Sequence, residues 1–555
     1  MKKIKNKEII LGCIGIFVFL SCIILWKIGT RTYGNCYWGV LPASWIGAVT
    51  DFLSEKGMTP FIGTEGCGWD GQYYYAWSNE IFNPDTEFAD VYTCQRIGMP
   101  LIAKIFSVIL RQDYVYPLTF LMVSAIAVSL ASYVYMQYVK DRNWSAILCI
   151  IPWIFSYGMI ITVRDGLPDA CGDAFFIIAF ICFLSEKRLG YLFAMSWAIL
   201  SREFYIVTAF MIFAYMFVIR TKKLANDTGG GYERFIDYFK DGFSYAFPGA
   251  VYLGWQYYLC KRFHLPLSKI FSKGDRLVLP FSDGVKCFEN FVSNGYMRNS
   301  IFFVLYVILL ILCFSLIILC LKSNKKYLVL IPAVISVSML DTVVMADASG
   351  FMKVMGFILL TIPLCIGELY DSKKIIVSKN GKQILYFFLL FYIFFNLYEV
   401  SAGTWQLGWI PYKIYMENGN TEKVNVSNEN NNDYLPELPH EIELLNVTES
   451  PYSDMPFKKI FQLPYVVCDI KITNLSDDVF YCQDNNGVLG VHIVSQIRDT
   501  KGEAVQQYIY ANQLAKDLEP GESIEQKIIL SYEKGKAIKE IKLGLIQYGG
   551  IISYN

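Results

Sequence analysis

Long apolar stretches recur from the N-terminus to about residue 400, and they constrain the fold more than any other feature of the sequence. They cover residues 9–26, 117–139, 144–163, 170–184, 189–219, 243–260, 301–321, 327–346, 351–367 and 384–400. A helix of about 20 apolar residues crosses the roughly 30 Å hydrocarbon core of a bilayer, and most of these stretches are that long or nearly so. The sequence therefore predicts a polytopic α-helical membrane protein with about eleven spans, if the longest stretch holds two.

The stretch 189–219 decides the topology, because it is too long for one crossing and carries Arg202 and Glu203 in its middle. If two short spans meet there, the basic clusters at 140–142, 186–188, 220–223, 322–326 and 371–374 all lie on one side. That arrangement satisfies the positive-inside rule, whereas one long helix would move the last two clusters across. The run 9–26 follows a cationic segment without a small-residue cleavage site, so we expect a retained first span. We therefore expect a multi-pass protein of the cytoplasmic (inner) membrane, with a cytoplasmic N-terminus and an extracytoplasmic C-terminal domain.

The composition divides the chain into a membrane domain and a tail. The expected membrane domain is 1–402, and its large extracytoplasmic loop, 29–116, includes an apolar piece at 97–110 that suits an interfacial helix. Residues 403–455 are polar and rich in Asn, which predicts a linker. Alternating apolar residues over 491–497 and 541–545, with a turn sequence EPGE between them, predict an all-β sandwich in 456–555.

Charge and cysteine usage argue against several classes of protein. The 49 basic and 49 acidic residues cancel, whereas a nucleic-acid binder would carry a basic surface. Only three histidines and no CxxC pair occur, which argues against a zinc site. Most of the 15 cysteines are expected to pack as small apolar residues. A disulfide is left open among Cys36, Cys67 and Cys94, and another between Cys468 and Cys482.

The densest polar and aromatic cluster is GWDGQYYYAW at residues 68–77, within the loop 29–116. Its glycines admit a close approach of the backbone, and its aromatic faces can stack on a sugar ring. The carboxylate of Asp70 could accept a proton from an attacking hydroxyl. The alternative is that the aromatic residues mark the membrane interface and that Asp70 caps a helix beginning at Gly71.

Ionisable residues gather at those ends of the spans that the topology puts on the outer side. They are Arg164, Asp165, Asp169, Asp173, Arg202, Glu203, Asp347 and Lys353. Charges at membrane depth are costly unless they face a cavity or a partner, so the group predicts a polar site, although each charge could instead pair within the bundle or with lipid phosphates. Asp169 and Asp173 share a helix face at i and i+4. Fixed positive charge stabilises a phosphate leaving group, and the candidates are Arg96, Arg202 and Lys353.

In their order along the chain, these motifs resemble the bacterial polyprenyl-phosphate-sugar-dependent glycosyltransferases of the C-type membrane fold (GT-C). GWDGQYYY, with Asp70, looks like the WDG-x-x-Y pattern of that family's first extracytoplasmic loop. YTCQRIGMP, with Gln95, Arg96 and Pro100, looks like the segment that often follows it. LPDACGDAFF from Leu167 and AILSREFYIV from Ala198 look like the later Asp-containing span and the Arg-Glu helix. The resemblance covers roughly the first 220 residues.

The resemblance implies an inverting transfer of a sugar from a polyprenyl-phosphate donor to a cell-envelope glycan or lipid-linked acceptor at the outer face. Asp70 would be the catalytic base, and Glu203 would orient Arg202. The residues implied in substrate binding are Trp69, Gln72, Tyr73, Arg96, Asp169, Arg202, Glu203 and Lys353. No metal ligand is assigned, because Asp70 lacks the adjacent acidic residue of many relatives, and a divalent metal is left open.

Two other classes of function stay open at this stage. A transporter or flippase of lipid-linked saccharides would use intramembrane charges for translocation. A non-catalytic envelope-assembly protein would act through its tail, whose TNLSDDVFY and LEPGES segments resemble β-sandwich modules of bacterial polysaccharide-assembly proteins. Such modules bind glycan or sit beside it, and a spacer without a ligand is the alternative. In every case the lipid bilayer is a partner and nucleic acid is not.

Overall fold

The computed structural model of the chain falls into two units, Met1–Ile23 with Tyr73–Ser401 and Ile24–Gln72 with Ala402–Asn555. The structure describes residues 6–31, 70–82, 92–140, 146–226, 240–266, 278–293, 296–346, 348–372, 389–398, 413–416, 421–423, 439–449, 465–482, 490–503, 512–514, 516–531 and 536–548. The described part of the first unit is helical, and that of the second is mostly β-sheet.

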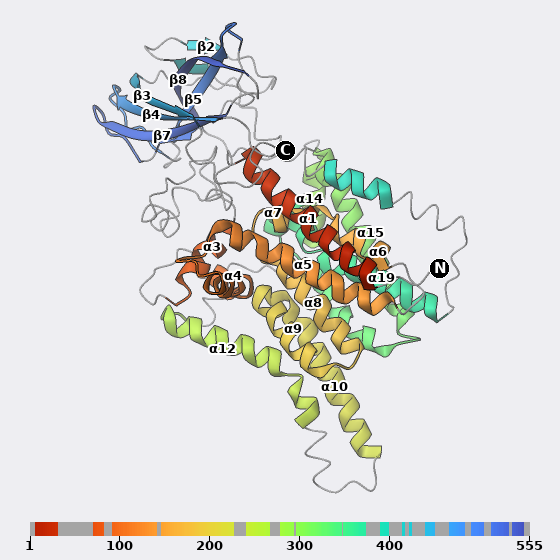
Figure 1. The fold of residues 1–555 in the computed structure, drawn as a ribbon. Helices are drawn as coiled ribbons and strands as arrows, with labels where there is room; N and C mark the ends of the chain where they lie inside the picture. Colours follow the sequence, from red (N-terminus) through yellow and green to blue (C-terminus); the bar gives the residue numbers. More distant parts are fainter. Residues whose placement is uncertain are drawn as a thin grey trace. The chain divides into compact units, whose positions relative to one another are not determined.

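Most of the helices lie within the apolar stretches, whereas others, such as α3 and α14, lie outside them (Figure 1). The first half comprises α1 (Asn6–Arg31), α3 (Gly71–Glu80), η2 (Thr93–Gln95), α4 (Gly98–Ile109), α5 (Pro117–Lys140), α6 (Ala146–Ile154), α7 (Tyr157–Arg164), α8 (Asp169–Leu184), α9 (Arg188–Ser201), η3 (Glu203–Tyr205) and α10 (Ile206–Asn226). The second half comprises α12 (Phe247–Arg262), α14 (Ser282–Ser293), α15 (Met297–Cys320), η4 (Lys325–Leu330), α16 (Ile331–Val337), α17 (Thr342–Met345), α18 (Ala348–Lys353) and α19 (Gly356–Asp371). A further helix covers Leu389–Tyr398.

Four described helices are long and apolar enough to cross a membrane: Asn6–Ile28, Pro117–Lys140, Glu203–Lys222 and Met297–Cys320. A bent pair, α7 with α8, makes a fifth candidate if it counts as one span. Large apolar side chains on these helices are exposed, as Ile311 of α15 is at 59%. Apolar surface of this kind needs a lipid environment. The chain is therefore a membrane protein, while the count of about eleven spans stays a prediction.

Two stretches, each expected to supply one span, are divided into shorter helices. The stretch 144–163 divides into α6 and α7, because Ser156 accepts a hydrogen bond from the backbone N–H of Met159 and caps a new helix. The stretch 327–346 divides into η4, α16 and α17, and Asp341 caps the last of these through the N–H of Val344. That each of these two stretches supplies one span stays a prediction.

The turn between α7 and α8 bends the chain by 118°. Gly166 has a φ of +69°, a conformation that L side chains rarely adopt, and a Cβ there would lie 2.9 Å from the ring of Phe120. The turn therefore redirects the chain sharply within the few residues between α7 and α8. It leaves Asp169 in the first turn of α8.

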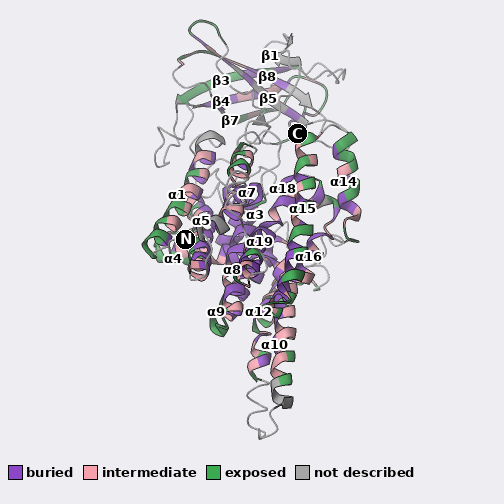
Figure 2. Cartoon of the chain, turned by 90° about the vertical axis from the view of Figure 1, so that its right-hand side faces the viewer, coloured by how far each residue is buried: buried purple, intermediate pink, exposed green. Residues whose placement is uncertain are grey.

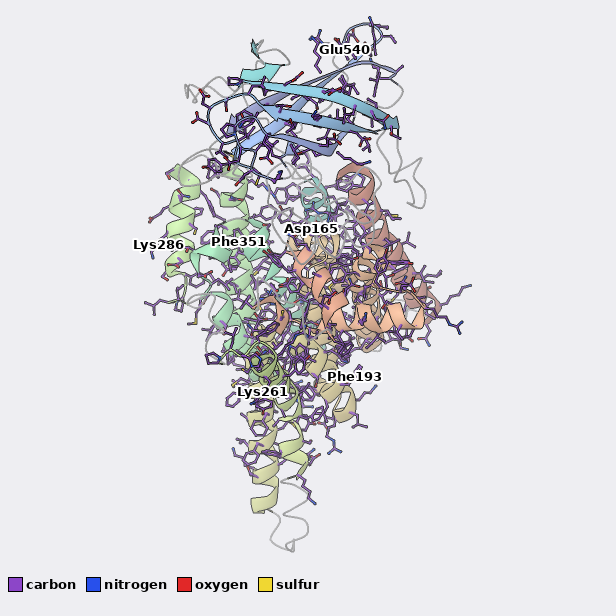
Figure 3. All side chains as sticks on the ribbon, turned by 90° about the vertical axis from the view of Figure 1, so that its left-hand side faces the viewer. Asp165, Phe193, Lys261, Lys286, Phe351 and Glu540 are labelled. Atoms are coloured by element: carbon purple, nitrogen blue, oxygen red, sulfur yellow. The ribbon has the colours of Figure 1, made fainter. Side chains whose placement is uncertain are left out.

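The stretch 189–219 is interrupted where the sequence predicts. α9 ends at Ser201, Arg202 is extended with φ −155° and ψ 108°, and η3 leads into α10. The buried residues of the helical unit gather on α7, α8, α18 and α19, whereas α10 is largely exposed or half-buried (Figure 2). Asp165 and Phe193 are both labelled in Figure 3; Asp165 is fully buried, whereas Phe193 of α9 is 63% exposed.

The second unit contains two antiparallel sheets, in strand orders β2-β1-β8-β5-β6 and β3-β4-β7. The strands are β1 (Lys413–Met416), β2 (Thr421–Lys423), β3 (His440–Glu449), β4 (Tyr465–Asn474), β5 (Gly490–Asp499), β6 (Asn512–Gln513), β7 (Ser523–Ser531) and β8 (Ile538–Tyr548). One apolar core joins both sheets, and it includes Ile470 of β4, Ile493 of β5 and Leu545 of β8. This arrangement is a β-sandwich with the alternation that the sequence predicts. The expected linker, 403–455, contains the sheet strands β1, β2 and β3.

The disulfide considered between Cys468 and Cys482 is not formed. Cys468 is fully buried in the core of the sandwich, whereas the thiol of Cys482 lies beside the carboxylate of Asp517. Burial raises the pKa of each thiol to about 12. Cys94 is buried and forms no disulfide with a described residue, while Cys36 and Cys67 lie outside the described residues.

Candidate functional site

A buried ion-pair cluster forms where the first turn of α8 meets the last turn of α9. Arg202 Nε lies 3.2 Å from Asp169 Oδ1, and Arg202 Nη1 donates to Asp173 Oδ1 at 3.3 Å. The hydroxyl of Tyr205 also donates to Asp173 Oδ1. Arg202 is 5% exposed, so the two carboxylates compensate a charge that is almost wholly removed from water. We call Arg202, Asp169, Asp173 and Tyr205 the Arg202 group.

The helices form this group because of how their ends are built. Asp169 and Asp173 lie at i and i+4, and Gly172 lies on the same face between them. A Cβ on Gly172 would lie 2.9 Å from the Cβ of Arg202, so only glycine lets α8 approach this closely. The two acids that the sequence placed on one helix face are thus the partners of Arg202, a contact that was not predicted.

A second ion pair joins η2, in the first loop, to η3. Arg96 Nε donates to Glu203 Oε2 at 2.8 Å, and Arg96 Nη2 donates to Glu203 Oε1 at 2.7 Å. The hydroxyl of Tyr92 donates to Glu203 Oε1 at 3.1 Å, and Arg96 Nη1 donates to the hydroxyl of Tyr74 at 3.3 Å. Burial alone would lower the pKa of Arg96, but Glu203 outweighs it, and the pKa lies well above its ordinary range. We call Arg96, Glu203, Tyr92 and Tyr74 the Arg96 group.

Lys353, at the C-terminal end of α18, adds a third positive charge. Its backbone oxygen accepts a hydrogen bond from Arg202 Nη1 at 3.4 Å, and its charge interacts with Asp169. Within the described part of the chain, its amine makes no hydrogen bond or ion pair. The two arginines are thus already neutralised by carboxylates, whereas the half-buried ammonium of Lys353 has no close partner there.

The structure corrects one predicted contact. Glu203 does not orient Arg202, because its carboxylate binds Arg96 instead. The physical reason is the extended backbone at Arg202, which sends adjacent side chains to opposite sides. The alternative considered for Arg202 and Glu203 was that each pairs with a neighbouring segment, and this agrees with their contacts.

The residues around Asp70 are described only in part. Asp70 is exposed, and the helix α3 begins directly after it at Gly71. Gln72 is fully buried and Tyr73 is half-buried, whereas Trp69 lies outside the described residues. Asp347 lies outside them as well. Arg164 and Asp165, which are adjacent in the sequence, pair with each other in a buried salt bridge of 2.8 Å.

Sequence reasoning missed the three tyrosines that complete the two groups. Tyr92 precedes Arg96 by four residues and Tyr205 follows Arg202 by three, so their spacing carried a signal. Tyr74 lay within the aromatic cluster but was not expected to contact an arginine. In the portions of the chain that the structure describes, no set of three or more His, Cys, Asp or Glu side chains is arranged to hold a metal ion.

Fold and site together define a membrane protein whose helical unit holds arginine–carboxylate pairs that are buried or half-buried, and whose second unit holds a β-sandwich. No protein-family model matches the chain, and no curated protein matches it. A solved structure similar to it is that of ArnT from Cupriavidus metallidurans bound to undecaprenyl phosphate, at 11% sequence identity and a TM-score of 0.34. The match covers 67% of this chain, and the chain spans 62% of the length of that structure.

Proposed function

We propose that the chain is a membrane glycosyltransferase that moves a sugar from a polyprenyl-phosphate donor to a cell-envelope glycan or lipid-linked acceptor on the outer face. The observation that carries the proposal is Lys353. Its ammonium has no close partner within the described residues and lies next to the Arg202 group, in a protein that exposes apolar helices. A cation held in this way suits a lipid-linked phosphate, because charge at membrane depth requires a counter-ion.

The roles of the cations follow from their partners. Lys353 is the primary phosphate ligand, since binding phosphate there breaks no existing ion pair. Arg202 and Arg96 stay paired with their carboxylates. They contribute to phosphate binding through their positive charge and through any N–H groups that these pairs leave unbonded. Asp169 lines the same site and positions Arg202, while Gln72 and Tyr73, with Trp69, shape the sugar site.

The proposed reaction is a single displacement with inversion. The acceptor oxygen forms a bond to the anomeric carbon as the bond from that carbon to the phosphate oxygen breaks, and the phosphate leaves with the electron pair. Asp70 takes the proton of the attacking hydroxyl. The positive charge of Lys353 stabilises the negative charge that develops on the leaving phosphate.

The test is transfer by purified protein in nanodiscs, with labelled polyprenyl-phosphate sugars as donors. Asp70→Asn should lower the rate by about 10²–10⁴-fold, the usual contribution of a general base. Asp113→Asn is the matched control, because Asp113 is an exposed acid of the same loop. An unchanged rate in Asp70→Asn would remove the base assignment, and absence of product with every donor would remove the reaction.

A second candidate function is a transporter or flippase of lipid-linked saccharides. The broken helices favour it: α7 and α8 meet at 118°, and charged residues stand at this bend and at the break between α9 and α10. Discontinuous helices of this kind form the binding sites of many transporters. Redistribution of the labelled lipid between leaflets without any new glycosidic product would favour this candidate over the enzyme.

A further inference from the structure

Gln256 is a buried amide whose two polar atoms have no hydrogen-bond partner in the described part of the chain. It is 1% exposed, and neither Nε2 nor Oε1 makes a hydrogen bond. Tyr252, Gln256 and Leu259 form the buried face of α12. Nearly all buried polar side chains in folded proteins are hydrogen-bonded, because an unsatisfied one costs free energy. An amide that is orphaned at both ends therefore points to a group that arrives from outside the chain.

The neighbours of Gln256 connect it to the Arg96 group. One helical turn earlier, the hydroxyl of Tyr252 donates to Gln95 Oε1 at 3.2 Å, and Gln95 directly precedes Arg96. Trp255 Nε1 donates to the carbonyl of Cys94 at 3.1 Å. These two bonds fix α12 against η2. Tyr252 also lies near enough to Glu203 and Arg96 to interact electrostatically with both side chains. Gln256 thus belongs to a polar strip that continues from the Arg96 group onto α12.

The chemistry of this strip differs from that of the cations. A primary amide offers a donor and an acceptor side by side without a net charge. A sugar hydroxyl also donates and accepts, so it can satisfy both atoms of the amide, whereas a phosphate could use only the donor. The ring of Trp255, stacked on Tyr258 at 5.0 Å, adds an aromatic surface beside it.

We propose that Gln256 is a specificity residue that hydrogen-bonds a hydroxyl of a sugar ring, in a subsite separate from the phosphate ligands. This inference rests on the proposed glycosyl transfer and adds to it a further residue that recognises a sugar, beside Gln72, Tyr73 and Trp69. A site that hydrogen-bonds a substrate hydroxyl discriminates strongly against analogues that lack it.

The test compares two isosteric variants that each remove one orphaned polar group. Gln256→Met removes the amide, and Thr361→Val is the matched control. Thr361 is 1% exposed in α19, and its hydroxyl has no hydrogen-bond partner among the described residues. Thermal unfolding in nanodiscs is measured without lipid, with bare polyprenyl phosphate, and with polyprenyl phosphates carrying a pentose, a hexose or an N-acetylhexosamine.

Without lipid, both variants should unfold at or above the wild-type temperature, because each loses an unsatisfied group. Bare polyprenyl phosphate should stabilise all three proteins equally. At least one sugar-bearing lipid should stabilise the wild type further, and Gln256→Met alone should lose that increment, with affinity about ten- to a hundredfold weaker. A raised acceptor KM with an unchanged donor increment would instead assign the hydroxyl to the acceptor, and would still support recognition of a sugar by Gln256.

The other outcomes overturn the inference in distinguishable ways. If Gln256→Met and a second variant, Gln256→Leu, both unfold well below the wild type while Thr361→Val does not, the amide is structural. If bare lipid stabilises the wild type but no sugar adds to it, and the acceptor KM is unchanged, the subsite is refuted and the phosphate site stands. If no lipid stabilises the wild type, the proposed function falls together with the subsite.

Discussion

The bidentate pair of Arg96 and Glu203 allows a quantitative prediction, because its two side chains are largely buried and its geometry is known. Arg96→Met keeps the volume of the side chain and removes its charge. It leaves the carboxylate of Glu203, which is 26% exposed, without the two hydrogen bonds of 2.7 and 2.8 Å that it receives from the guanidinium. The hydroxyl of Tyr92 remains as a donor.

The magnitude follows from the burial of the pair. Removing one partner of a fully buried ion pair costs about 3–5 kcal/mol, and the residual exposure of Arg96 and Glu203 puts the expected loss near the lower end, about 3 kcal/mol. The double variant Arg96→Met/Glu203→Gln leaves no unpaired charge. It should therefore lose less than the sum of the two single variants, by about 1–3 kcal/mol.

The assay is equilibrium unfolding of the purified protein by SDS titration in mixed micelles, run on all corners of the cycle. Arg188→Met is the control, because the salt bridge of Arg188 with Asp241 is more exposed, at 46% for the arginine, and should contribute at most about 1 kcal/mol. Equal losses in Arg96→Met and Arg188→Met, or additive losses in the cycle, would refute the assignment of this pair as a buried, coupled unit.

Three further predictions concern single residues. Lys353→Met should weaken binding of bare polyprenyl phosphate about ten- to a hundredfold and Lys353→Arg should largely retain it, as measured by lipid-dependent thermal stabilisation. Gly356→Ala should cost about 1–3 kcal/mol in SDS unfolding, because its Cβ would fall 1.5 Å from Asp173 Oδ2, whereas Gly249→Ala, with nothing within 4 Å, should be neutral or stabilising. Burial alone would raise the pKa of Asp499, but backbone N–H groups and Lys536 outweigh it and lower the pKa. The ionised carboxylate should therefore stabilise the sandwich above the unfolded pKa of about 4, and this stabilisation should be lost as the pH falls. Hydrogen exchange of β5 in the full chain should therefore be faster in Asp499→Asn than in the wild type at pH 7, and the difference should shrink as the pH falls below about 4. A difference that stays constant in acid would contradict this.

The break in the stretch 189–219 could be predicted because its cause is local. A helix buried in lipid cannot carry Arg202 and Glu203 without partners, and the length of the stretch left room for a second helix. The common face of Asp169 and Asp173 could also be predicted, since two acids at i and i+4 share a helix face, although their pairing with Arg202 was not.

Which side chains pair with Arg202 and which with Glu203 could not be predicted from the sequence in the same way. It depends on the extended backbone of Arg202 and on the approach of η2 to η3, which brings Arg96 within reach of Glu203. Neither follows from spacing along the chain. The resemblance placed Arg96 and Glu203 in one family pattern without saying that they bind each other.

The broken helices show a signal that hydropathy overlooks. Ser156 and Asp341 are isolated polar residues within long apolar runs, and each accepts a hydrogen bond from a backbone N–H three residues later. Such N-cap residues begin new helices. An average over about 20 residues dilutes them, so each run looked like one span although the capping residues were visible in the sequence.

The claim that the Arg202 group and Lys353 surround a lipid phosphate is tested most directly by an experimental structure of the protein with bound polyprenyl phosphate in nanodiscs. The phosphate density should lie within hydrogen-bond distance of Lys353 Nζ, with the salt bridges of Arg202 to Asp169 and Asp173 intact. Phosphate density bound elsewhere, with the amine of Lys353 facing away from it, would contradict the claim.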